Sequence, residues 1–336
     1  MTRVAVVILN YNGEKLLPRF LPSVIRYSPE AQIIVADNGS SDGSVRILRT
    51  NFPQVTILEL GRNFGFCGGY NHALRQVKAD YYVLLNSDVE VTDHWLTPLL
   101  SLLDNRREIA AVQPKILSYQ QRNLFEYAGA GGGFLDSLGY PFCRGRVFDH
   151  VEQDLGQYDD ERPVFWASGA CMMVRSDKFH EHHGFDEDFF AHMEEIDLCW
   201  KLNRSGNTVY YCGKSTVYHL GAGTLGYNHP RKIYLNFRNG LSLIFKHLNS
   251  GELIYKLPFR MALDWLAALV YLFKGQGANF VSVLRAHTSF LGQTGRLVRK
   301  RRLIRRAYPS YPKTYIHGGL IIADYYLRKK KSFPLQ

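Results

Sequence analysis

The fold is decided near the N-terminus by the stretch VAVVILNYN, residues 4–12. Its first six residues are apolar and mostly β-branched, and the polar residues Asn10 and Asn12 follow them. The same pattern returns twice, because Gln32–Ala36 is followed by DNGSSDG and Tyr81–Leu85 by NSD. Short apolar runs without alternation are typical of strands that are buried on both faces. The sequence therefore predicts three strands that each end in a polar cluster.

Helical segments alternate with these strands. We expect helices over Glu14–Tyr27, Ser44–Thr50 and Tyr70–Val77, and a further strand over Val55–Leu60. The alternating order predicts an α/β fold, with a mostly parallel, mixed, Rossmann-like sheet and helices on both faces. Residues 118–163 are rich in glycine, tyrosine and charge, and we interpret them as an insertion or a long loop beside the site.

The polar clusters predict where a ligand binds. In an open parallel sheet, ligands bind beyond the carboxyl ends of the strands. The clusters that begin at Asn10, Asp37 and Asn86 all follow strands, so adjacent parallel strands would bring them to one crevice. The alternative is that asparagine, aspartate, serine and glycine simply form turns there. The occurrence of three such clusters favours a binding site.

Four segments together resemble a known family. They are Asn10-Tyr11-Asn12, Asp37-Asn38-Gly39-Ser40, GRNFGFCGGYN (residues 61–71) and Asn86-Ser87-Asp88. In this order they resemble the family-2 glycosyltransferases, and most closely the rhamnosyltransferase-like members, over residues 3–240. The resemblance implies the GT-A fold, a nucleotide-diphosphate sugar as donor, and inversion at the anomeric carbon. It also implies a donor site formed by Asn10, Asn12, Asp37, Asn63, Gly68, Asn86, Ser87, Trp166 and Gly169.

The chemistry of the donor-site residues agrees with these roles. A carboxylate such as Asp37 can accept hydrogen bonds from a nucleobase or a ribose hydroxyl. The glycines of residues 65–69 let backbone N–H groups approach an anion where a helix begins, although close helix–sheet packing is the alternative. Trp166 and Gly169 belong to the segment WASGA, which resembles one that lines the sugar and acceptor pocket. The alternative for this segment is a tight turn packed by an aromatic ring.

A divalent metal, Mg²⁺ or Mn²⁺, is the cofactor that the resemblance implies. The family's usual Asp-x-Asp motif is replaced by Asn86-Ser87-Asp88, so Asp88 remains as the metal ligand. Hard cations bind oxygen ligands and retain several waters, so one carboxylate and the substrate phosphates suffice. His219 matches a position at which many GT-A enzymes place a ligand to the metal or the diphosphate. A structural histidine is the equally weighted alternative.

Three acids stand where a helix is expected to begin, over about Glu194–Arg204. Acids in a first turn are favoured by the helix dipole, so capping is one interpretation, and the same field would keep these carboxylates ionised. The segment EEIDL, residues 194–198, resembles the family's Glu-Asp-x-Asp-Leu motif, in which the second acid is the general base. The resemblance thus assigns catalysis to Glu195, with Glu194 as the second choice.

Composition and charge divide the chain. Of its 336 residues, 46% are apolar and 21% charged, which excludes a disordered or fibrous protein. Residues 1–230 hold 21 basic and 27 acidic side chains, whereas 231–336 hold 20 basic and 3 acidic ones. We interpret 1–230 as the nucleotide-sugar-binding catalytic domain and 231–336 as a helical, basic extension that associates with an anionic membrane surface. Apolar residues between the charges make nucleic acid the less favoured partner. The structural alternative is a helical extension that packs on the catalytic domain or on a second subunit.

Together these observations predict an inverting glycosyltransferase. It would move a sugar, with rhamnose as a candidate, from a nucleotide-diphosphate sugar to a hydroxyl of a lipid-linked saccharide in cell-surface polysaccharide synthesis. No apolar stretch is long enough to span a bilayer, so we expect a cytoplasmic, peripheral location on the inner face of the membrane. The alternative is a non-catalytic nucleotide-sugar or saccharide-binding protein of the same fold, which would need neither Asp88 nor Glu195.

Overall fold

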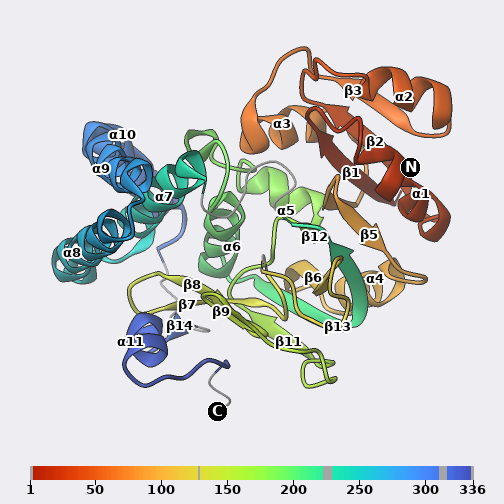
Figure 1. Cartoon of the computed structure of the whole chain (residues 1–336). Helices are drawn as coiled ribbons and strands as arrows, with labels where there is room; N and C mark the ends of the chain where they lie inside the picture. Colours follow the sequence, from red (N-terminus) through yellow and green to blue (C-terminus); the bar gives the residue numbers. More distant parts are fainter. Residues whose placement is uncertain (1–2, 128, 222–228, 310–315, 334–336) are drawn as a thin grey trace.

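A central mixed sheet organises the chain in the computed structural model, which describes residues 3–127, 129–221, 229–309 and 316–333 (Figure 1). Its N-terminal half has the order β3-β2-β1-β4, and all neighbouring strands there are parallel. These strands are β1 (Val4–Asn10), β2 (Gln32–Asp37), β3 (Thr56–Glu59) and β4 (Tyr81–Asn86). In their register Asn10 pairs with Asp37 and Leu9 with Asn86, so the polar clusters meet at one edge.

The other half of the sheet is mixed. Strand β12 is antiparallel to both β4 and β6, while β13 runs parallel to β6 and antiparallel to β11 and β5. The bounds are β5 (Val89–Val91), β6 (Ile109–Ser118), β11 (Glu161–Val164), β12 (Cys171–Arg175) and β13 (Thr208–His219). Strand β13 is the longest of these strands. Its last residue, His219, pairs with Val89 and therefore lies beside Asp88.

Helices cover both faces of this sheet, as the sequence predicts. They are α1 (Leu17–Tyr27), α2 (Ser44–Asn51), α3 (Gly65–Leu74), α4 (Leu96–Asn105), α5 (Ser176–Glu181), the 3₁₀ turn η1 (Glu187–Phe189) and α6 (Glu194–Arg204). Alternate residues of β1 enter different cores, Ala5 and Val7 with α3, and Val6 with α1 and α4. Both faces are thus buried, which explains the uninterrupted apolar strand sequences.

Residues 118–163 are more ordered than a long loop. Most of a second, smaller sheet forms here from β7 (Gly133–Asp136), β8 (Pro141–Cys143), β9 (Arg146–Val147) and β10 (His150–Val151). The side chains of Leu135 and Phe142 are buried in the same core as α3 and α6. Strand β14 (Ile316–His317), from near the C-terminus, pairs with β7. Glycine-rich sequence therefore marks tight packing between sheets here, rather than an irregular loop.

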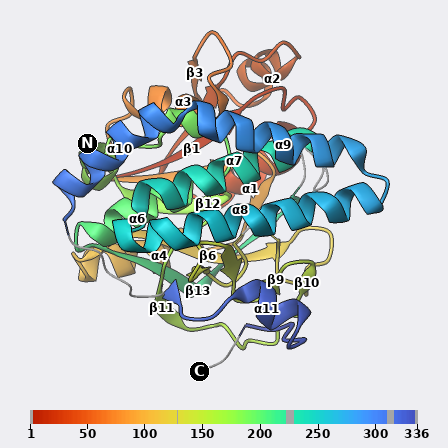
Figure 2. The same cartoon turned by 90° about the vertical axis from the view of Figure 1, so that its left-hand side faces the viewer.

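The C-terminal region is helical, as expected. Its helices are α7 (Pro230–His247), α8 (Ser250–Phe273), α9 (Gly277–Gly292), α10 (Thr294–Ala307) and α11 (Ile321–Tyr326). Figure 2 shows α7 to α10 lying across one side of the molecule. Within the described ranges, no helix combines the length and apolarity needed to cross a bilayer. The division of the chain into two domains near residue 230 stays a prediction.

Candidate active site

The ends of β1 and β2 form a hydrogen-bonded cluster. The amide of Asn10, which is buried, donates to Asp37 Oδ1 at 2.9 Å and to Ser40 Oγ at 3.1 Å. The other Asp37 oxygen accepts from the Ser40 backbone N–H at 3.0 Å. Asn12, with a left-handed φ of 53°, accepts a hydrogen bond from the Ser41 backbone N–H at 2.8 Å. The two predicted donor-binding segments are thus locked together at the edge where the strands end.

Helix α3 begins at Gly65, earlier than the expected start at Tyr70, and its first turn is tightly packed. Asn63 Oδ1 accepts from the Gly65 N–H at 2.8 Å, and the Phe190 carbonyl accepts from the N–H groups of Phe66 and Cys67. The first backbone donors of the helix are therefore used within the protein. A methyl group at Gly68 would come 2.9 Å from Phe64 Cβ, so this glycine is needed for close packing.

Asp88 and His219 form a buried pair next to these segments. His219 Nε2 lies 3.1 Å from Asp88 Oδ1 and 3.4 Å from the Asn86 amide nitrogen, and His219 Nδ1 lies 3.2 Å from Glu126 Oε2. Burial alone would lower the pKa of His219, but the carboxylates of Glu126 and Asp88 outweigh it and raise the pKa to about 10. Ser87, which lies between Asn86 and Asp88 in the sequence, is half-buried.

A divalent metal bound to this pair would have to replace the proton that the raised pKa keeps on His219 Nε2, because a ligating imidazole is neutral. A carboxylate oxygen and an imidazole nitrogen face one another, and Glu126 holds the opposite ring nitrogen, which is a common way to orient a ligating histidine. In the part of the chain that the structure describes, no group of three such side chains could hold a metal by itself. A metal here would therefore take its remaining ligands from water and substrate oxygens, as Mg²⁺ and Mn²⁺ commonly do.

Glu194 and Glu195 begin α6 and have raised pKa values. Burial raises the pKa of Glu195 to about 7, and burial together with the Glu195 charge raises the pKa of Glu194 well above its usual range. The expectation that the helix dipole keeps both carboxylates ionised is thus wrong, because desolvation outweighs the dipole. Glu195 is half-buried and Glu194 is buried. A carboxyl group that titrates near pH 7 is well placed to act as a general base.

Gly169 brings the acidic helix to the strand ends. A methyl group at Gly169 would lie 3.5 Å from the Phe66 ring and 3.9 Å from Glu195 Cβ. The next residue, Ala170, accepts a hydrogen bond at its carbonyl from the Asn86 N–H at 3.0 Å. A chain of contacts thus connects Glu195 with the segment of Asp88, and the pairing of β1 with β2 and β4 extends it to Asp37.

The Trp166 side chain contacts the smaller sheet, whereas Gly169 lies beside α3 and α6. Its ring covers Gly133, where a methyl group would come within 2.2 Å of the indole, and its N–H donates to the Phe134 carbonyl at 2.9 Å. These contacts join the two sheets and leave the side chain buried. A role for Trp166 in binding the sugar stays a prediction.

The segment before α6 has a strained backbone. Phe190, His192 and Met193 all have left-handed φ angles, of 65°, 70° and 74°. Such angles cost free energy in residues other than glycine and cluster at functional sites. Asn239 of α7 holds this segment by donating from its amide to the carbonyls of Phe189, Ala191 and His192, at 2.8–3.1 Å. No motif in the sequence marks Asn239, which is one of several polar residues of α7.

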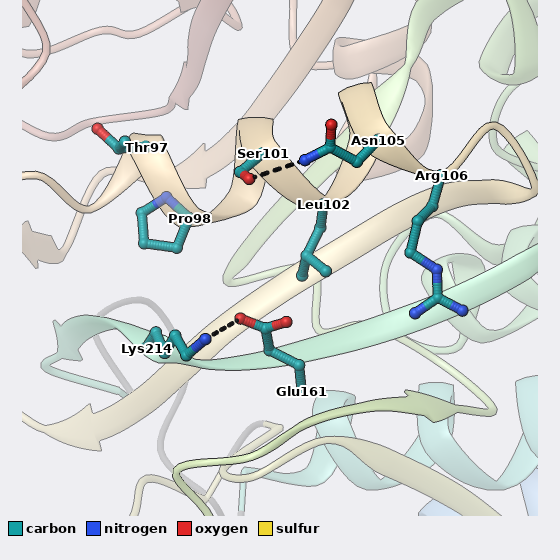
Figure 3. Close-up of a pocket in the computed structure, with 8 residues that line it drawn as sticks. All are labelled: Thr97, Pro98, Ser101, Leu102, Asn105, Arg106, Glu161 and Lys214. Atoms are coloured by element: carbon teal, nitrogen blue, oxygen red, sulfur yellow. Dashed lines mark hydrogen bonds and ion pairs between the residues drawn. The ribbon is translucent and has the colours of Figure 1, made fainter.

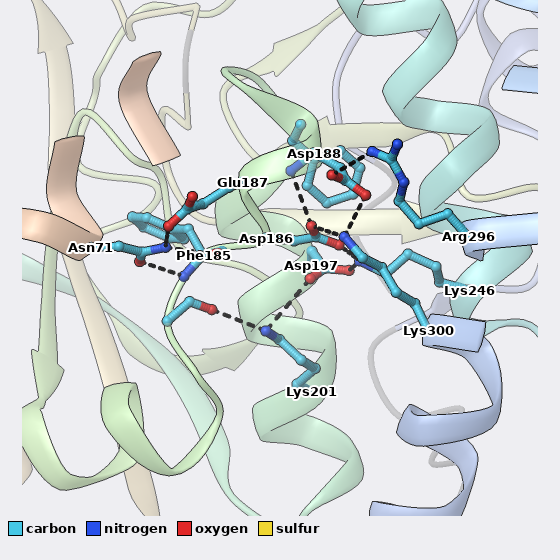
Figure 4. A network of polar contacts seen from close by, with 12 residues as sticks. Asn71, Phe185, Asp186, Glu187, Asp188, Asp197, Lys201, Lys246, Arg296 and Lys300 are labelled. Carbon is cyan, nitrogen blue, oxygen red and sulfur yellow. Dashed lines mark hydrogen bonds and ion pairs between the residues drawn. The ribbon is translucent and has the colours of Figure 1, made fainter. Parts of the chain in front are cut away.

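A network of ion pairs joins α6 and the segment before it to α7 and α10 (Figure 4). Asp197 Oδ1 lies 2.6 Å from Lys246 Nζ and 2.7 Å from His247 Nε2, and Lys246 also contacts Asp186 at 2.6 Å. Burial would raise the pKa of Asp197, but Lys246 and Lys201 hold it well below its usual value. The network continues to Asp188 and to two cations of α10, Arg296 and Lys300.

A surface hollow lies away from all these residues (Figure 3). It is lined by Thr97, Pro98, Ser101, Leu102, Asn105, Arg106, Glu161 and Lys214, between α4 and the β11–β13 edge of the sheet. None of the predicted site residues is among them. The candidate site is therefore the edge at which β1, β2 and β4 end, with α3 and α6 beside it.

Comparisons with known proteins agree with this geometry. The model of the family "Glycosyl transferase family 2" matches residues 5–182. The chain is 28% identical over 242 residues to an N-acetylglucosaminyl-diphospho-decaprenol L-rhamnosyltransferase of Mycobacterium tuberculosis, covering 66% of this chain and 77% of the relative. It is 24% identical over 265 residues to the rhamnosyltransferase WbbL of Escherichia coli, covering 76% and 96%.

Solved structures show the same fold. GalNAc-T7 with UDP, GalNAc and Mn²⁺ matches with a TM-score of 0.57 at 16% identity, over 93% of this chain and 58% of that one. The mannosyltransferase PcManGT of Pyrobaculum calidifontis with GDP-Man and Mn²⁺ matches with a TM-score of 0.54 at 13% identity, over 86% and 87%. The GT-A prediction is confirmed by these matches. On the family match and the rhamnosyltransferase relatives, the chain belongs to glycosyl transferase family 2 and is a glycosyltransferase of the rhamnosyltransferase-like type.

Proposed function

We propose that the chain transfers a sugar from a nucleotide-diphosphate sugar to a hydroxyl group of a saccharide acceptor, with inversion at the anomeric carbon. The observation that carries this proposal is Glu195. Its carboxyl group has a pKa raised to about 7, its Oε2 atom has no hydrogen-bond partner among the described residues, and it lies in the first turn of α6 next to Gly169. A pure binding protein would have no need for such a costly group beside its ligand.

The donor site would use both sides of the strand edge. Asp37, fixed by Asn10 and Ser40, would accept hydrogen bonds from the base or ribose. Asp88 and His219 would hold the divalent metal, and Asn12, Asn63, Gly68, Asn86 and Ser87 would line the donor site around them. When bound, the metal would neutralise the negative charge that develops on the departing diphosphate. This division places the leaving group on the side of the site opposite Glu195.

The chemical step would be a single displacement. Glu195 takes the proton of the acceptor hydroxyl while the acceptor oxygen forms a bond to C1 of the sugar. The bond between C1 and the diphosphate oxygen breaks at the same time, and its electrons leave with the nucleoside diphosphate. Attack from the side opposite the leaving group inverts the configuration at C1. Glu194, which is buried more deeply, is the alternative base.

The names of the relatives and the charge pattern of the chain support a proposal for the acceptor and for the location of the protein. The mycobacterial relative's name describes a diphospho-decaprenol substrate, and others in the comparison are named for O-antigen and glycan synthesis. We therefore propose a lipid-linked saccharide acceptor and a role in cell-surface polysaccharide synthesis, with rhamnose as the candidate sugar. Residues 1–230 would form the catalytic domain, and residues 231–336 would bring it to the cytoplasmic face of the membrane.

A thermal-shift screen tests the donor proposal. The full chain is heated with a panel of nucleotide-diphosphate sugars, each with Mn²⁺, with Mg²⁺ and with a chelator. A ligand at about 100 times its dissociation constant stabilises the folded protein by about 2.7 kcal/mol. We expect one sugar nucleotide to raise Tm, and only with metal. A panel without any metal-dependent shift contradicts the proposal.

Product analysis then separates an enzyme from a binding protein. The sugar nucleotide that raises Tm is incubated with the protein and a saccharide on a polyprenyl diphosphate, and the new linkage is read by NMR. An inverted linkage supports the proposal. A Tm shift without product would favour the non-catalytic alternative.

A further inference from the structure

Helix α8 presents its apolar side chains to solvent. Nine large apolar residues of this helix are exposed: Ile254, Tyr255, Phe259, Trp265, Leu266, Leu269, Val270, Leu272 and Phe273. The exposed fraction reaches 86% for Phe273 and 76% for Ile254. Residues 255, 259, 262, 266, 269 and 273 repeat at steps of four and three, so they form one stripe along the helix. We call the nine exposed large apolar residues listed above the α8 face.

The charged residues of α8 point inward and fix this orientation. Lys256, Arg260 and Asp264 stand four residues apart and form a charged stripe along the helix, and Arg260 and Asp264 are buried. Arg260 lies over the Tyr140 ring at 3.3 Å, and its Nε donates to Asp264 Oδ1 at 3.2 Å. Asp264 also accepts from the Tyr140 hydroxyl at 3.3 Å. Rotating α8 to hide its apolar face would break these buried contacts, so the exposure belongs to the fold.

Positive charge flanks the α8 face. Figure 2 shows α8 on the outer side of the helical layer, with α10 beyond α7 on one side and α11 on the other. The exposed cations of the helical layer and of the segment after α11 include Lys274 and Arg285, then Arg299, Arg302, Arg305 and Arg306 of α10, and Arg328, Lys329, Lys330 and Lys331. Between residues 253 and 309, the sole acid of the sequence is the buried Asp264.

We propose that the α8 face lies in the interface of an anionic phospholipid bilayer, with the flanking cations on the lipid headgroups. An amphipathic helix with aromatic and aliphatic residues on one side binds in this way, and each nearby cation adds attraction to anionic lipid. A second copy of the chain is the other candidate occupant. A symmetric pair of α8 faces would bring the basic flanks of the two copies together, so charge favours the lipid surface.

The helical layer that carries the α8 face is joined through α10 to the segment before α6. Arg296 and Lys300 of α10 contact Asp188 and Asp186, which precede α6 and its Glu195. The active site would therefore be held at a fixed height above the bilayer, where a lipid-linked saccharide ends. The docking proposal rests on the proposed function only for this purpose, because binding to lipid needs neither donor nor acceptor.

Vesicle sedimentation tests the proposal with the full chain. The chain is mixed with vesicles of phosphatidylcholine alone, or of equal parts phosphatidylcholine and phosphatidylglycerol, without any sugar nucleotide. We expect binding to the anionic vesicles and little to the neutral ones. The triple variant Phe259→Ser, Leu266→Ser, Phe273→Ser should lower the partition coefficient by about tenfold or more, since three apolar side chains lose their lipid contact.

Two further variants complete the design. Arg299→Gln, Arg302→Gln, Arg306→Gln should lower binding to anionic vesicles by about tenfold or more at low salt. Leu155→Ser is the matched control, because Leu155 is a 78% exposed apolar residue outside the helical layer. It should bind like the unaltered chain. Tm and circular dichroism of each variant show whether the fold is kept.

The results decide between lipid and a second copy. Loss of vesicle binding in the two triple variants, but not in Leu155→Ser, supports the proposal. Absence of binding to anionic vesicles by the unaltered chain overturns it, as does a dimer in analytical ultracentrifugation that the α8 variant converts to a monomer. Either overturning result leaves the proposed transfer intact if the protein still glycosylates a water-soluble acceptor, so the two proposals fail separately.

Discussion

Glu195 and Asp197 lie two residues apart on α6, and burial affects them in opposite ways. Both are at the start of the helix, where the helix dipole favours a negative charge. The pKa of Glu195 is raised to about 7 by burial, whereas Lys246 and Lys201 hold the pKa of Asp197 well below its usual value. The difference is in the partners, because Asp197 forms ion pairs with Lys246 and Lys201, whereas Glu195 forms no ion pair with any residue that the structure describes.

This contrast separates two uses of a buried carboxylate. The Asp197 charge is matched by lysines from α6 and α7, so it joins the C-terminal helix α7 to α6. In the part of the chain that the structure describes, no cation pairs with the Glu195 carboxylate, so the group readily takes up a proton at neutral pH. One helix turn thus carries a structural acid and a candidate catalytic acid, and substitutions at the two positions should have different consequences.

The largest effect is expected for Glu195→Gln. The amide has nearly the same shape but cannot take a proton, so kcat should fall by about 10²–10⁴-fold, which is the usual contribution of a general base. The Kd for the sugar nucleotide with metal should stay nearly unchanged, because the proposed mechanism assigns Glu195 to the acceptor rather than to the donor. Single-turnover transfer and a donor titration measure the two quantities.

Glu194→Gln is the matched control for this substitution. Glu194 has the same chemistry one residue earlier but is more deeply buried, so its loss should lower kcat less. If Glu194→Gln abolishes transfer and Glu195→Gln retains it, the base is Glu194. Normal turnover in both variants would refute a carboxylate base on α6.

Asp197→Asn should act on stability. Removing one partner of a buried ion pair commonly costs about 3–5 kcal/mol, since the remaining charges stay buried. Lys246 keeps Asp186 as a partner at 2.6 Å, so we expect the lower end of this range. Denaturant unfolding at pH 7 measures the loss, and Asp93→Asn, at an exposed position, is the control with little change.

The pH dependence of this loss has a definite sign. A carboxyl group with a lowered pKa in the folded state stabilises the protein above its unfolded pKa, and the contribution disappears as pH falls through the folded pKa. The difference between Asp197→Asn and the unaltered chain should therefore shrink in acid. A difference that grows as pH falls would contradict the assigned ion pairs.

Much of the fold could be predicted because its determinants are local. The strands around Val6, Ile34 and Val83 are short apolar runs, and the polar residues that end them lie where the structure places the site edge. The bounds of α6 agree with the expected Glu194–Arg204. Motif order was enough to identify the family, because each motif lies within a few residues along the chain.

Long-range contacts explain what the sequence did not reveal. Asn239 holds carbonyls that lie 47 to 50 residues earlier, and nothing next to it in the sequence indicates this. The charged stripe of α8 could be seen in the sequence, but periodicity does not say which side of a helix faces the protein. The partner Tyr140 comes from the connection between β7 and β8, so only the tertiary structure shows that Arg260 points inward.

The smallest expected effect is the pH dependence that Glu195 imposes. With a pKa of about 7, the base is ionised above pH 7, so kcat/KM should fall by about tenfold for each pH unit below it. The same raised pKa means that the folded state binds a proton more tightly than the unfolded state, so Glu195 should destabilise the fold as pH rises from about 4.5 towards 7. Glu195→Gln should therefore match the unaltered chain in Tm at pH 4 and exceed it at pH 8. A flat rate profile together with equal Tm values at pH 8 would show that the Glu195 carboxyl group titrates like an ordinary surface acid, and the contrast with Asp197 would disappear.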